Sequence, residues 1–170
     1  MSHWQKIRDA ADNLRREICA ANDLDENALL RAGGLLDSAA AYLELDLIPE
    51  HPDSNNLSRA MAVLEDDCVY FNNHLKSWYK TFCIAHEIGH FVLHHQSVHC
   101  TREEISDLAA GGEANGAVEK LIGYGAGMRR EREANLFALE LILPCAVLKN
   151  AFLEKNMSAG EIAEAVGMPV

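Results

Sequence analysis

The chain has 170 residues, with 15 basic against 26 acidic side chains and a formal net charge of −11. Because proteins bind a nucleic-acid duplex largely through Lys and Arg that neutralise phosphates, this charge argues against direct nucleic-acid binding and against a polybasic membrane anchor. At 49% hydrophobic and 24% charged residues the composition is typical of a folded protein. We therefore expect a single domain over residues 1–170.

No run approaches the roughly 18–20 apolar residues of a membrane span, and the charged N-terminal segment lacks the apolar region of a secretion signal. We therefore expect a cytoplasmic protein with no membrane partner. The five cysteines are odd in number, scattered and without a C-x-x-C pair. They predict neither a disulfide framework nor a thiolate metal site, and we expect small, mostly buried thiols.

Hydrophobic periodicity predicts an α+β fold, mostly helical, with a small, about three-stranded sheet. Gly33 and Gly34 are expected to break the start of the second helix, and Pro49 to end the first strand. The expected elements, in chain order, are helices over 3–20 and 27–43, a strand over 45–48, a hairpin over 61–64 and 68–71, a helix from 76 to 94 or 95, a helix over 128–143, a weaker helix to 155 and a last helix over 162–166.

The second half of the chain also carries capping signals and a glycine-rich stretch. Two S/T-x-x-E patterns, at 101–104 and 158–161, have the form of capping boxes that begin helices. Residues 111–127 are rich in glycine and predict a loop, which beside an active site would be able to act as a lid. The expected parts of the domain are an N-terminal helical part at about 1–40, a catalytic core over 41–155, and the start of a C-terminal helical unit over 156–170, truncated or fused to further domains.

The informative segment runs Thr81-Phe-Cys-Ile-Ala-His86-Glu87-Ile-Gly-His90-Phe-Val-Leu-His94. Residues four apart on a helix share a face, so His86 and His90 can direct their imidazoles at one ion, and zinc is the natural occupant. Glu87 directly follows His86 and so lies one residue round the helix from it. In H-E-x-x-H metallopeptidases the carboxylate at this position serves as the general base. Gly89 is expected to leave room on the helix for a substrate backbone.

The alternative interpretation of this segment is a helix whose histidines face solvent or are satisfied internally. Its flanking residues are apolar, which predicts a helix buried almost all round. Two histidines and a glutamate are costly to bury there without a metal or hydrogen-bond partners, so the pattern favours a metal site.

A catalytic zinc needs a third protein ligand and an open fourth position. A candidate lies in the predicted helix that contains Glu131-Arg-Glu-Ala-Asn-Leu-Phe-Ala-Leu-Glu-Leu141. The apolar residues of this helix form an arc that is expected to be buried. Glu131 lies about 60° from the centre of this buried arc, and Glu133 lies about 100° from it. We therefore expect Glu131 to be the ligand, with Glu133 as the fallback and otherwise a solvated charge. Asn135, one turn after Glu131, is placed to hold a ligating histidine by a hydrogen bond.

Other polar groups near the motif have supporting roles at most. His94, His95 and His99 are expected to be structural or to support the ligands. The oxyanion formed during hydrolysis needs a further donor, which Tyr124 in the glycine-rich stretch or one of these three histidines would supply. An extended substrate is expected to add by backbone hydrogen bonds to the sheet at 61–64 or 68–71.

The run T-F-C-I-A-H-E-I-G-H-F-V-L-H, followed by E-R-E-A-N-L-F-A-L-E-L-I-L-P, resembles the ImmA/IrrE family of zinc metallo-endopeptidases, gluzincin-like proteins with two His ligands and a downstream Glu. The resemblance covers about residues 40–170. It implies regulated cleavage of a protein partner, often a helix-turn-helix transcriptional repressor, in mobile-element control or stress responses. The separation of 41 residues between His90 and Glu131 is longer than the family leads us to expect, and the glycine-rich insert would reshape the substrate cleft.

We therefore expect a peptidase in which Zn²⁺ is held by His86, His90 and Glu131 and Glu87 is the general base. Two alternatives stay open. One is a zinc-binding regulatory module that binds a partner without cutting it. The other is a structural zinc in an accessory domain, closed by His94 or His99 as fourth ligand. The acidic surface would suit a basic partner such as a DNA-binding protein.

Overall fold

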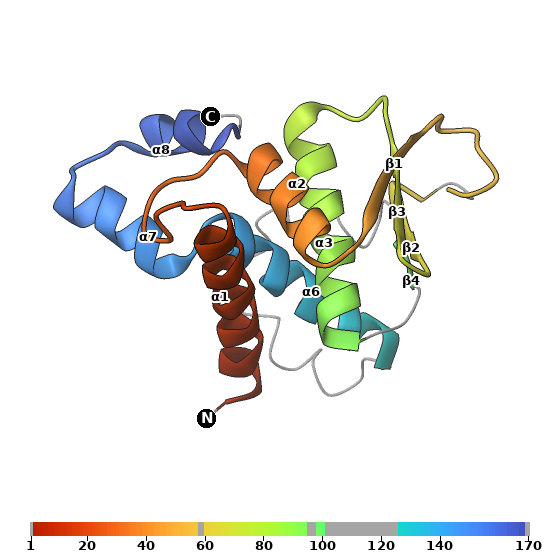
Figure 1. The fold of residues 1–170 in the computed structure, drawn as a ribbon, viewed down its shortest axis with the longest axis horizontal. Helices are drawn as coiled ribbons and strands as arrows, with labels where there is room; N and C mark the ends of the chain where they lie inside the picture. The colour runs from red at the N-terminus through yellow and green to blue at the C-terminus, as the bar shows by residue number, and fades with distance from the viewer. Residues whose placement is uncertain (1, 58–59, 95–97, 101–125, 169–170) are drawn as a thin grey trace, which may run out of the picture.

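The fold is seen in a computed structural model that describes residues 2–57, 60–94, 98–100 and 126–168 (Figure 1). Helices predominate beside a small mixed sheet, which confirms the α+β class. The elements are α1 (His3–Ala21), α2 (Ala32–Tyr42), β1 (Asp46–Glu50), β2 (Ala62–Glu65), β3 (Cys68–Asn72), α3 (Ser77–His94), β4 (Val98–Cys100), α6 (Ala126–Ile142), α7 (Cys145–Lys149), the π-helix η1 (Asn150–Glu154) and α8 (Ala159–Val166).

Helix α1 forms where the periodicity predicts it. The Ser2 hydroxyl accepts a hydrogen bond from the Gln5 backbone N–H at 3.2 Å and so satisfies one of the unpaired donors at the helix start. Ile7, Leu14 and Ile18 lie on the buried face, which packs against α6 and α2. These N-terminal helices share one continuous core with the sheet, α3 and α6.

Helix α2 starts later than predicted, at Ala32, and Gly33 and Gly34 lie inside its first turn instead of breaking it. The preceding segment is held outside the helix by the buried Arg15 side chain. Its guanidinium donates to the carbonyls of Glu26 at 3.1 Å and Ala28 at 2.8 Å. Those carbonyls are satisfied without helix formation, which accounts for the late start.

The sheet has the three expected strands and a fourth, in the order β1-β3-β2-β4. Strand β1 pairs in parallel with β3, whereas β2 is antiparallel to both β3 and β4. The expectation that Pro49 ends the first strand is wrong, because β1 continues to Glu50. β1 lies at an edge of this sheet, where a missing backbone N–H need not break the ladder.

The sheet order also corrects the expected site of substrate addition. Residues 61–64 and 68–71 were expected to offer an edge. Instead, β2 lies between β3 and β4, and β3 lies between β1 and β2. Both strands of the hairpin therefore have partners on both sides, and the edges of the described sheet are β1 and β4. β1 pairs with β3, and β4 pairs with β2. Each of these pairings joins segments that are distant in sequence, so the hydrophobic pattern of a single strand does not reveal it.

Helix α3 lies between the sheet and α6 (Figure 1). Gly89 allows the close approach of α3 to α6. A Cβ at this position would stand 3.1 Å from both the Cα and the carbonyl oxygen of Ala134, and 3.2 Å from the Phe137 ring. The expected opening for a substrate backbone at Gly89 is therefore wrong, since the backbone of α6 occupies that space.

Replacing Gly89 with alanine is expected to destabilise the fold by about 1–3 kcal/mol, because the added methyl group overpacks a backbone contact. Urea unfolding of the two proteins measures the change. Gly33→Ala is the matched control, since nothing lies within 4 Å of its added Cβ, and it is expected to stabilise the protein by about 0.4–1 kcal/mol. Equal effects of the two substitutions would contradict the packing role of Gly89.

The C-terminal segment follows Pro144, where α6 has ended. The weaker helix expected to 155 is α7 followed by η1. The predicted capping box of α8 is confirmed, because Ser158 and Glu161 each bond the other's backbone N–H. Among the described residues no single helix meets the length and hydropathy requirements of a membrane span. The pair 128–142 and 145–154, bent by 48°, meets them jointly.

The described cysteines are free thiols. Cys19 and Cys83 are buried as expected, whereas Cys68 and Cys145 are half-buried. The Cys100 side chain, the capping box at 101–104 and the glycine-rich stretch up to 125 lie outside the described residues.

Candidate metal centre

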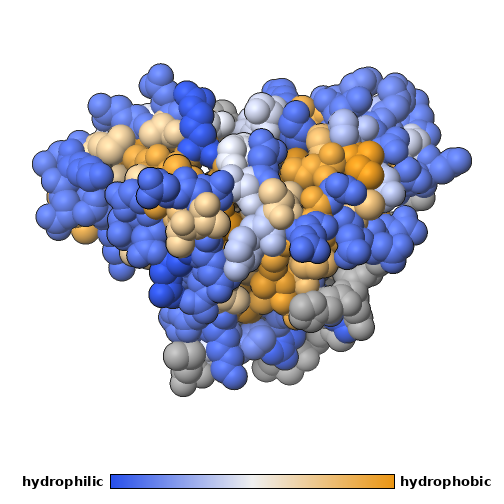
Figure 2. Space-filling view, viewed as in Figure 1, coloured by the Kyte–Doolittle hydropathy of each residue, from blue (hydrophilic) through white to orange (hydrophobic). Residues whose placement is uncertain are grey.

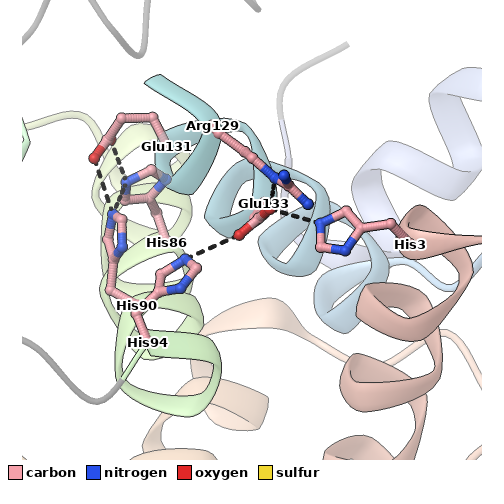
Figure 3. Close-up of polar contacts among 7 residues, drawn as sticks. All are labelled: His3, His86, His90, His94, Arg129, Glu131 and Glu133. Atoms are coloured by element: carbon pink, nitrogen blue, oxygen red, sulfur yellow. Dashed lines mark hydrogen bonds and ion pairs between the residues drawn. The ribbon is translucent and has the colours of Figure 1, made fainter. Parts of the chain in front are cut away.

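Two helices bring the expected ligands together. His86 and His90 lie one turn apart on the buried face of α3, and Glu131 reaches them from α6 (Figure 3). Both histidines are fully buried, and Glu131 is 8% exposed. The ligand atoms of these three residues lie within 4.8 Å of one another, and among the described residues they form the one group with this metal-binding geometry.

The spacing of the donor atoms suits a small tetrahedral ion. The two imidazole Nε2 atoms are 3.0 Å apart, and they lie 3.2 Å (His86) and 3.3 Å (His90) from the two carboxylate oxygens of Glu131. Tetrahedral zinc with bonds of 2.0–2.1 Å separates its ligand atoms by about 3.3 Å. Two imidazoles and one carboxylate are also a ligand set that catalytic zinc uses.

Asn135 sets the protonation pattern of His86. Its Oδ1 lies 2.9 Å from Nδ1 of His86, so the predicted hydrogen bond is present. Because a carboxamide oxygen only accepts, the proton of a neutral His86 sits on Nδ1. The lone pair of Nε2 then faces His90 and Glu131, as a metal ligand requires.

The charges of the three residues are strongly coupled. Burial alone would raise the pKa of Glu131, but hydrogen bonds and positive charge from His86 and His90 outweigh it and hold that pKa well below its usual value. Burial would lower the pKa of His86, yet the hydrogen bond to Glu131 and the charges of Glu87 and Glu131 raise it. Burial lowers the pKa of His90, and its bond to Glu131 does not restore it.

Zinc affinity is accordingly expected to fall as the pH decreases. The ion competes with the proton on His86, whose pKa is raised above 6.5, so competition is already present near neutral pH. The affinity should fall by roughly tenfold per pH unit for each proton displaced. Competition with a chelating dye measures this dependence, with circular dichroism to confirm that the chain stays folded. A dissociation constant that does not change with pH would contradict binding through these imidazoles.

Glu87 is fully buried between α3 and the sheet. Its Oε2 accepts a hydrogen bond from the Leu64 backbone N–H of β2 at 3.1 Å. The side chain therefore fixes β2 against α3, and its charge is near enough to contribute to the raised pKa of His86. A buried carboxylate near His86 is a group that can accept and return a proton.

Glu133, the fallback ligand, points elsewhere. It is 7% exposed and contacts His3, Arg129 and His94, so its interpretation as a solvated charge is also wrong. His94 lies with its ring centroid 5.4 Å from that of His90 and its Nε2 3.6 Å from Glu133. Of the other expected groups, Tyr124, His95 and the His99 side chain lie outside the described residues.

Sequence reasoning missed the contact between His3 and Glu133, which joins residues 130 positions apart. The periodicity of α6 indicated only that Glu133 lies off the centre of the buried arc, and no local signal identified α1 as its partner. Comparison of the sequence with protein-family models and with curated proteins gives no match.

Proposed function

We propose that this protein is a zinc-dependent peptidase that hydrolyses a peptide bond in a protein partner. The observation that carries the proposal is the buried group of His86, His90 and Glu131, with ligand atoms within 4.8 Å of one another and a buried Glu87 beside it. The resemblance of the two motifs to ImmA/IrrE peptidases supports the same reaction. It also favours a helix-turn-helix regulator as the partner, and the charge of −11 would suit a basic protein of this kind.

His86, His90 and Glu131 would hold the zinc, and no described side chain joins them as a fourth ligand, which agrees with a catalytic site. When bound, zinc supplies a Lewis acid that brings the pKa of a coordinated water to about 7 and polarises a carbonyl. Glu87 accepts the proton of the attacking water on its carboxylate and returns it to the leaving amine. The Leu64 N–H keeps the Glu87 carboxylate in place, and Asn135 keeps the His86 ring in its ligating tautomer.

The test is hydrolysis of a proteome-derived peptide library by the zinc-loaded chain, with new termini identified by mass spectrometry. We expect cleavage at a limited set of sequences, loss of cleavage after treatment with phenanthroline, and recovery when zinc is returned. A zinc-loaded chain that cleaves neither this library nor an extract of folded proteins overturns the peptidase proposal. A chain that takes up no zinc overturns the metal centre as well.

A further inference from the structure

Glu133 joins three helices beside the metal centre (Figure 3). Its Oε1 lies 2.6 Å from the His3 Nε2 of α1 and accepts a hydrogen bond from the Arg129 Nε of α6 at 2.8 Å. Its Oε2 lies 3.6 Å from the His94 Nε2 at the end of α3. The buried carboxylate therefore bonds a nitrogen of α1 and one of its own helix, α6, and lies 3.6 Å from the His94 ring nitrogen of α3, beyond hydrogen-bond distance.

Burying a carboxylate costs free energy unless it is paired and hydrogen-bonded. Glu133 meets this requirement, because its Oε1 lies 2.6 Å from the His3 Nε2 and accepts a hydrogen bond from the Arg129 Nε. Burying the Glu133 carboxylate costs free energy, and Glu133 lies two residues after the ligand Glu131. Both observations suggest a role in the metal centre.

The geometry of α6 shows what Glu133 does there. At 100° per residue, side chains two positions apart project about 160° from each other around a helix. Accordingly Glu131 extends to the two histidines while Glu133 extends away from them toward α1 (Figure 3). A rotation of α6 that displaced Glu131 would also pull Glu133 away from His3 and His94, so the two contacts together fix the helix about its axis.

We propose that Glu133 is a positioning residue for the metal centre and that His3, through it, links α1 to the ligands. Glu133 sets the direction of Glu131 by fixing the start of α6, and it sets the last turn of α3 by its contact with His94, whose ring lies against that of His90. The inference rests on the proposed zinc site and adds α1 to the elements that form it.

Glu140 provides a matched control within the same pair of helices. It lies on α6, is 8% exposed, and faces Arg8 of α1 with 3.9 Å between Oε2 and Nε. It also accepts a hydrogen bond from the Cys145 N–H at 2.8 Å. It resembles Glu133 in burial and in bridging α1 to α6, but it has no contact with α3 or the metal ligands among the described residues.

The experiment compares Glu133→Gln with Glu140→Gln by zinc affinity, measured against a chelating dye, and by the visible spectrum of the Co²⁺-substituted chain. We expect Glu133→Gln to weaken zinc binding about 10–100-fold, the usual cost of losing a group that orients a ligand, and to alter the Co²⁺ spectrum. Glu140→Gln should lower the melting temperature of the zinc-free chain, yet leave zinc affinity within about twofold of wild type and the spectrum unchanged.

The His3 link has its own pair of variants. His3→Ala is expected to weaken zinc binding in the same direction as Glu133→Gln, whereas His3→Gln, whose amide can still donate to Glu133, should restore most of the affinity. Wild-type zinc affinity and Co²⁺ spectrum in Glu133→Gln would overturn the inference, as would equal losses in Glu133→Gln and Glu140→Gln. If the wild-type chain itself binds no zinc, the proposed function fails first, so the two failures are distinguishable.

Discussion

Replacing Glu87 with glutamine is expected to reduce peptide hydrolysis by about 10²–10⁴-fold, the usual contribution of a general base, while zinc content stays at the wild-type level. Glutamine keeps the volume of the buried side chain, and its amide oxygen can still accept the hydrogen bond that Glu87 takes from the Leu64 N–H. What it loses is the ability to take a proton. Hydrolysis rates on a peptide identified from the library, together with zinc content by elemental analysis, measure the two effects separately.

The same variant separates the peptidase from a binding module. If hydrolysis is the function, Glu87→Gln loses the biological effect on the partner but still binds it. If the effect persists in a variant that no longer cleaves, the chain acts by binding alone. Glu140→Gln serves as control for the loss of a buried carboxylate, and hydrolysis undiminished in Glu87→Gln would show that another group takes the proton.

The grouping of His86, His90 and Glu131 could be predicted because their relation to one another depends on helix geometry. A spacing of four residues places His86 and His90 on one face of α3 whatever the rest of the fold does. The angular position of Glu131 on its helix distinguished it from Glu133. Asn135, one turn further on, was expected to bond one of the two histidines, and in the structure that histidine is His86. Periodicity within each helix was therefore sufficient to predict which way these side chains point, and they come together because α3 packs against α6.

Features that depend on contacts between distant segments were not predictable in this way. A glycine inside the motif suggested space for a substrate, whereas Gly89 lies against the Ala134 backbone. The hairpin was expected correctly, but β1 and β4 cover both of its sides. The capping-box pattern of α8 was reliable because all of its hydrogen bonds are local. In contrast, the partner of Glu133 comes from the first helix of the chain.

Replacing Glu131 with alanine is expected to abolish zinc binding at ordinary zinc concentrations. The loss should exceed about 100-fold in affinity, since removal of a group that merely orients a ligand already costs 10–100-fold. Two imidazoles remain, and a two-ligand site holds zinc weakly. Elemental analysis of protein purified without added zinc should find about one zinc per wild-type chain, since the described residues contain one candidate ligand group, and almost none in Glu131→Ala.

Glu133→Gln is the control that makes this result specific. With saturating zinc this variant should still bind one ion per chain, because the Glu133 carboxylate that it loses contacts His3 and Arg129 and neither His86 nor His90. Zinc retained in Glu131→Ala and lost at saturation in Glu133→Gln would reverse the assignment of the third ligand.

The pH dependence of folding stability gives a second check on Glu131. The pKa of Glu131 is depressed, so its contribution to the stability of the zinc-free fold is present above the ordinary glutamate pKa and is lost as the pH falls through the depressed value. Glu131→Gln should therefore be less stable than wild type at neutral pH, and the difference should shrink in acid.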